Sequence, residues 1–162
     1  MNKMTIYELA IKTFGEKRQL MVVAEEYAEL TQQLLKAKNS RLDFNALLGE
    51  VADAIIVTEQ LKVVIGELPL SDIWQVNNQT FDATTNQLIK FMSEVTLWVL
   101  FDNKSPQYLE KVSLKSTLPF VVANIDAILS SLSAYLGHER INEIIVFKLN
   151  NIKKMLNGKE TV

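Results

Sequence analysis

The chain has no cysteine, only three prolines and five glycines, and a single histidine in 162 residues. The lack of cysteine excludes disulfides and thiolate metal sites, and the shortage of helix breakers favours long helices. A formal net charge of −2 gives no general reason to expect nucleic-acid binding. We find neither a signal peptide nor an unbroken run of about 18 apolar residues. We therefore expect a cytoplasmic protein with no membrane partner.

Apolar residues recur at helical spacing along most of the chain, which predicts an all-α protein forming one domain over 1–162. Asp43 is the expected N-cap of a third helix that ends near Gly66. Helices are predicted over about 5–15, 16–38, 43–65, 72–80, 106–113 and 139–156, with two long apolar helices in the second half, one of which opens at Gln87.

Five acids stand out in the second and third of these helices. Glu26 and Glu29 are three residues apart, as are Glu50 and Asp53, so each pair projects from one face of its helix. If the two helices pack antiparallel, four carboxylates come together, which is a ligand set suited to Mg²⁺. The alternative is that these acids form the solvated faces of two amphipathic helices, because Glu-rich helix faces are common. The apolar surroundings of Glu50 favour the metal site, since a buried acid needs a partner.

The pattern Glu-Glu-x-x-Glu, 20 intervening residues, then Glu-x-x-Asp resembles the signature of the all-α nucleoside triphosphate pyrophosphohydrolases. This superfamily includes the MazG-like proteins, the dimeric dUTPases and the dCTP pyrophosphatases. The resemblance implies a helical bundle and Mg²⁺, with Mn²⁺ as a substitute, held by Glu26, Glu29, Glu50 and Asp53. It also implies cleavage between the α and β phosphates of a nucleoside triphosphate. Glu25 matches the first acid of the motif, which suits a supporting or water-activating role.

The second half of the chain resembles a degenerate copy of the first. We expect repeat 1 over about 1–80 and repeat 2 over about 81–162. Alignment places Glu94 on Glu26 and Asp126 on Asp53, but Ala123 replaces Glu50, so the second acidic set is broken. The chain is thus predicted to be a single-chain pseudo-dimer with one intact acidic site. Whether it pairs again as a homodimer is left open.

An Asn pair ends each repeat, and the resemblance implies that an Asn and a Lys in such a segment contact the nucleotide. Asn151 and Lys154 match that segment in repeat 2, whereas repeat 1 offers Asn78 without the lysine. The alternative for Lys154 is an ordinary basic residue at a helix C-terminus. Trp74, near Asn78, is the first candidate to stack on the base, and Phe14 and Tyr27 are weaker ones.

Two functions therefore compete at this point, and a purely structural helical bundle, which predicts no metal-dependent change in melting temperature, is the third alternative. The first is a Mg²⁺-dependent pyrophosphohydrolase that converts a nucleoside triphosphate to the monophosphate and pyrophosphate. The second is a catalytically weak helical module that binds a nucleotide or a protein partner and retains the acids as a relic. The intact set of Glu26, Glu29, Glu50 and Asp53 favours the enzyme, because a relic is expected to lose acids.

Overall fold

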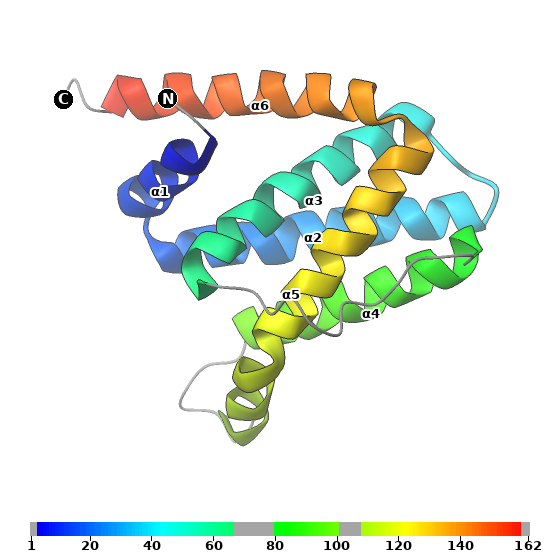
Figure 1. Ribbon diagram of the computed structural model, residues 1–162, viewed down its shortest axis with the longest axis horizontal. Coiled ribbons are helices and arrows are strands. Elements are labelled where there is room, and N and C mark those ends of the chain that lie inside the picture. Colours follow the sequence, from blue (N-terminus) through cyan, green and yellow to red (C-terminus); the bar gives the residue numbers. More distant parts are fainter. Residues whose placement is uncertain (1–2, 67–79, 101–107, 160–162) are drawn as a thin grey trace.

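The protein is all-helical over the residues that the computed structural model describes, namely 3–66, 80–100 and 108–159 (Figure 1). This confirms the all-α class, whereas the bundle type that the resemblance implies stays a prediction. The helices are α1 (Lys3–Phe14), α2 (Glu16–Lys38), α3 (Phe44–Ile65), α4 (Phe81–Leu100), α5 (Tyr108–Leu136) and α6 (His138–Lys159). The helix predicted over 72–80 falls almost entirely outside the described residues, as do Trp74 and Asn78.

The helix ends follow local chemistry. Asp43 caps α3 as predicted, since its Oδ1 accepts a hydrogen bond of 3.0 Å from the Ala46 backbone N–H. Gly66 and Gly137 follow α3 and α5 at φ 83° and 118°, a backbone region that residues with a Cβ adopt only under strain. Each of these glycines donates its N–H to a carbonyl four residues earlier. The start of α3 and the ends of α3 and α5 therefore each depend on a single residue.

Four helices form the centre of the molecule. α2 packs against α3 and α4 packs against α5, while α2 also contacts α4 and α3 contacts α5. α6 packs across α3 and α1, and Figure 1 shows it along one side of the molecule. Two paired helices from each half agree with the arrangement expected of two repeats. Descent from a repeat, and the pseudo-dimer, stay predictions.

A buried hydrogen bond links α2 to α3 beside the acidic residues. The Tyr27 hydroxyl lies 2.8 Å from Thr58 Oγ1, and Thr58 donates its own proton to the Ala54 carbonyl at 2.6 Å. Tyr27 must therefore be the donor to Thr58. Burial raises the pKa of Tyr27, which keeps this hydroxyl protonated. The bond holds the two helices in register, so Tyr27 belongs to the core.

α5 is one continuous helix, so the prediction of a separate short helix over 106–113 is wrong. Residues 108–113 form the first turns of α5. No glycine lies between Tyr108 and Pro119, and the helix continues through that proline.

The segment Thr117–Leu136 is long and apolar enough to cross a membrane, but 56% of its 18-residue window is buried inside the fold. Asp126 within it pairs with Lys62 of α3 at 2.7 Å. These contacts are those of a core helix.

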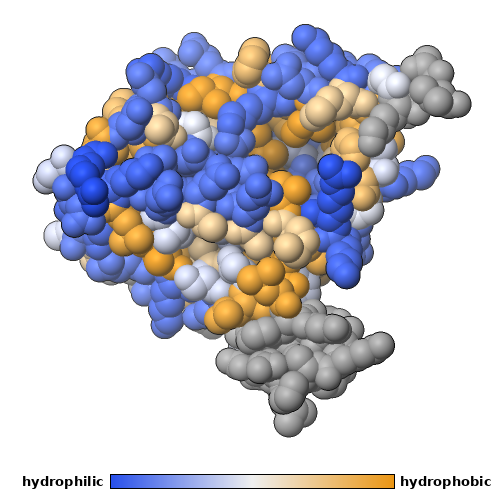
Figure 2. Space-filling model, turned by 180° about the vertical axis from the view of Figure 1, so that it is seen from behind, coloured by the Kyte–Doolittle hydropathy of each residue, from blue (hydrophilic) through white to orange (hydrophobic). Residues whose placement is uncertain are grey.

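The surface is polar with apolar patches between the charged side chains, as Figure 2 shows for one face. The most exposed large apolar side chains include Tyr135 at 75% and Phe147 at 66%. Apolar surface of this kind is compatible with pairing of two chains. The homodimer stays a prediction.

Candidate metal and substrate site

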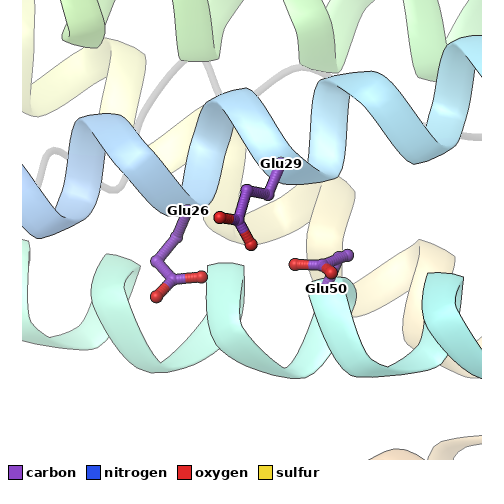
Figure 3. Close-up of side chains that lie close together, drawn as sticks. All are labelled: Glu26, Glu29 and Glu50. Carbon is purple, nitrogen blue, oxygen red and sulfur yellow. The ribbon is translucent and has the colours of Figure 1, made fainter.

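Three of the predicted acids converge between α2 and α3. Glu26 and Glu29 extend from α2 and Glu50 extends from α3 toward them (Figure 3). One carboxylate oxygen of each residue lies within 4.8 Å of the others. The spacing of three residues on α2 places both of its acids on the side that faces α3, and the packing of α2 against α3 brings Glu50 close to them.

The electrostatics of this cluster are unfavourable for three negative charges. The pKa of Glu26 is raised to about 7, first by burial and then by the neighbouring carboxylates of Asp53 and Glu29, against a lowering effect of Lys148. The pKa of Glu50 is raised by burial and then by Glu29 and Asp53. Glu29 is exposed, whereas Glu26 and Glu50 are half-buried. The cluster therefore carries more negative charge than the protein neutralises.

A divalent cation fits this donor set. The Oε2 atom of Glu50 is buried and has no hydrogen-bond partner among the described residues. A buried carboxylate oxygen without a partner is costly. Closely spaced carboxylate oxygens from two helices are the hard ligands that Mg²⁺ and Mn²⁺ prefer. The residues present thus suit such an ion on both charge and chemistry.

Asp53, the fourth predicted ligand, has a different partner. Its Oδ2 forms an ion pair with the Lys148 ammonium, which comes from α6 and is 95 residues away in the sequence. Asp53 still lies close enough to raise the pKa of both Glu26 and Glu50. It therefore borders the cluster of three rather than joining it.

A cavity of about 360 Å³ opens beside the cluster and is formed by α1, α2, α3 and α6. Glu26, Asp53 and Lys148 line it, together with Asn151, which was predicted from the sequence. Its lining is completed by Ala10, Phe14, Gln19, Val22, Ile56, Val57, Gln60, Ile152 and Met155. A small molecule placed here would meet charged groups in one part of the cavity and apolar walls elsewhere, as is common in small-molecule sites.

Two predicted residues belong neither to the acidic cluster nor to the lining of this cavity. Lys154 is exposed on α6 and Glu25 is exposed on α2, and neither lines the cavity. Lys148 was missed by the sequence analysis, although it stands three residues before Asn151 and so shares its helix face. Gln19 and Gln60 were missed too. Each is seven residues, or two helical turns, from an acid of the site, and that spacing was the available signal.

Without a divalent cation, we expect the protein to be more stable at pH 5 than at pH 8. The pKa of Glu26 is about 7 in the folded state against an ordinary value of 4.5, so between these values the folded state binds more protons. The free energy of unfolding therefore falls as the pH rises through that window. Because Glu26 keeps part of its hydration, we expect a difference of about 2 to 4 °C.

Thermal unfolding in EDTA across pH 5 to 8 measures this effect. Glu26→Gln should flatten the profile, because the amide does not titrate. A melting temperature that climbs steadily with pH in the wild type would show that the cluster is not electrostatically strained.

Taken together, these observations define an all-α protein in which a strained carboxylate cluster adjoins a partly apolar cavity. A comparison of the chain with protein families, with curated proteins and with solved structures finds no match. The function is therefore argued from the site itself.

Proposed function

We propose that this protein is a Mg²⁺-dependent nucleoside triphosphate pyrophosphohydrolase, which converts a (d)NTP to the (d)NMP and pyrophosphate. The observation that carries the proposal is the meeting of Glu26, Glu29 and Glu50 within 4.8 Å at the edge of a cavity of about 360 Å³. The spacing of these acids along the chain resembles the signature of the all-α pyrophosphohydrolases. Cation ligands and room for a nucleoside thus adjoin each other.

The three carboxylates would hold the ion. Bound Mg²⁺ neutralises charge on phosphate oxygens and makes a water more acidic. Asp53 would offer a further oxygen ligand if Lys148 released it. Lys148 would then be able to donate hydrogen bonds to a phosphate oxygen, for which a lysine ammonium is well suited.

The reaction requires no protein nucleophile. The oxygen of a water forms a bond to the α phosphorus, the bond from that phosphorus to the bridging oxygen breaks, and pyrophosphate leaves with the electron pair. One proton of the water must go to a base. Glu29 suits this task because it is the exposed member of the cluster and can pass the proton to solvent. Asn151 lines the same cavity and can hydrogen-bond the sugar or a phosphate.

The proposal is tested by pyrophosphate release from canonical and modified dNTPs in the presence and absence of Mg²⁺. We expect release that depends on the cation and differs among bases. Mg²⁺ should also raise the melting temperature, because an ion that binds only the folded state at 100 times its Kd stabilises it by about 2.7 kcal/mol. In a domain of this size that corresponds to about 5 to 10 °C.

The competing function is a helical module that binds a nucleotide or a protein partner without turnover. It predicts no pyrophosphate from any nucleotide. A folded protein that neither releases pyrophosphate nor responds to Mg²⁺ would contradict the enzyme.

A further inference from the structure

Two buried glutamine side chains line the same cavity as Glu26 and Asp53. Gln60 is 4% exposed and Gln19 is 9% exposed. The Oε1 atom of Gln60 is buried and accepts no hydrogen bond from any residue that the structure describes. Buried amides are nearly always paired in native proteins, because an unpaired polar atom loses its hydration without compensation. Gln60 therefore lacks a partner that a bound ligand can supply.

The position of these amides relative to the acids is set by helix geometry. Gln19 precedes Glu26 by seven residues on α2, and Gln60 follows Asp53 by seven residues on α3. Seven residues correspond to two helical turns, or about 10 Å along the axis. Because α2 and α3 run in opposite directions where they pack together (Figure 1), both amides lie displaced from Glu26 and Asp53 toward the same end of the cavity. That displacement is comparable with the length of a nucleoside from its 5′ oxygen to the far edge of its base.

The walls between these two polar groups are apolar. Phe14, Val22, Ile56 and Ile152 contribute to them, and such side chains suit the faces of a flat heterocycle. A cavity of about 360 Å³ falls in the range of small-molecule sites. A carboxamide offers a donor and an acceptor side by side. It therefore complements the edge of a nucleobase on which an N–H group adjoins a carbonyl or a ring nitrogen.

We propose that this cavity receives the nucleoside of the substrate and that the Gln60 carboxamide, assisted by Gln19, reads the hydrogen-bonding edge of the base. The identity of the occupant as a nucleotide rests on the proposed function. The substrate class is then a nucleoside triphosphate whose base-pairing edge is free, and a base alkylated on that edge is rejected. Gln60 is a specificity residue in this scheme and takes no part in the attack on phosphorus.

The chain offers a matched control for Gln60. Gln33, on α2, is also buried and also has an unpartnered Oε1 among the described residues, yet it does not line the cavity. Replacing either glutamine by leucine removes a buried amide oxygen that has no hydrogen-bond partner among the described residues, so both variants should unfold at the wild-type temperature or above it. Only Gln60→Leu should lose base recognition.

The test measures the Kd of four α,β-imido dNTPs, which cannot be cleaved at that linkage, by calorimetry with Mg²⁺. We expect the wild type and Gln33→Leu to prefer the same base, and Gln60→Leu to bind that analogue about tenfold or more weakly. The analogue methylated on the pairing edge of the preferred base should bind the wild type as weakly as the unmodified analogue binds Gln60→Leu. Gln19→Leu should show a smaller loss and serves as a second variant in the same cavity.

Each result bears on one proposal or the other. If Gln60→Leu keeps both the affinity and the base preference of the wild type, or if the wild type binds none of the analogues, base reading by Gln60 is overturned. If pyrophosphate release depends on Mg²⁺ but its base preference is the same in Gln60→Leu, the hydrolase stands and the inference fails. If the analogues bind through Gln60 and no dNTP is ever cleaved, the inference stands and the hydrolase fails.

Discussion

Replacing Glu50 by glutamine is expected to lower Mg²⁺-dependent pyrophosphate release by about a hundredfold or more, the scale seen when one charge-stabilising group is removed from an active site. Glu50 is the only member of the carboxylate cluster that α3 contributes, and its Oε2 has no partner among the described residues. The amide removes a negative ligand while keeping the size of the side chain. Steady-state assays of both proteins with the best dNTP measure the loss.

The fold should survive this substitution. In EDTA at pH 8, the melting temperature of Glu50→Gln should equal or exceed that of the wild type, because burial and the carboxylates of Glu29 and Asp53 already disfavour the charge on Glu50. Its response to Mg²⁺ should be much smaller. These two readouts separate a lost metal ligand from a damaged fold.

Glu94→Gln is the matched control for the loss of activity. Glu94 aligns with Glu26 in the predicted second repeat, but it is on α4 and is not one of the three clustered acids. Its replacement should leave both turnover and the Mg²⁺ response unchanged. Equal losses in Glu94→Gln and Glu50→Gln would mean that the cluster between α2 and α3 is not the active site.

Leu30→Ala is expected to lower the free energy of unfolding by about 3 kcal/mol. Leu30 is fully buried on α2, which packs against both α3 and α4. Truncation removes apolar contact and leaves a cavity that the neighbouring helices cannot close completely. The melting temperature should fall by about 6 to 12 °C in a domain of this size.

Leu35→Ala on the same helix controls for this effect. Leu35 is 47% exposed, so its truncation should change the melting temperature by about 2 °C or less. Denaturant unfolding of the two variants provides the comparison. A similar cost for both would indicate that α2 does not pack in the core as the structure describes.

Local sequence patterns were sufficient for the helices that position the site. The limits predicted for α2 and the N-cap at Asp43 are confirmed. These features depend on residues within one or two turns of each other, such as the side chain of Asp43 and the N–H of Ala46. The prediction of a separate helix over 106–113 was wrong because a local start signal cannot show whether one helical segment is continuous with the next.

The acidic site was predictable in part. A spacing of three residues places Glu26 and Glu29 on one helix face whatever the tertiary structure, and the apolar surroundings of Glu50 indicate that α3 is buried. Whether the two faces meet depends on how α2 and α3 pack. The structure brings three of the four predicted ligands together.

The sequence by itself thus determined an all-α chain with acids on the faces of two consecutive helices, because helix periodicity is a property of neighbouring residues. Only the tertiary structure decided that Asp53 pairs with Lys148 from 95 residues away. It alone decided that Gln19, Gln60 and Asn151 border one cavity beside the acids. Such contacts depend on the packing of α6 and α1 against α2 and α3. That packing is set by the fit of whole helix surfaces, which no local pattern records.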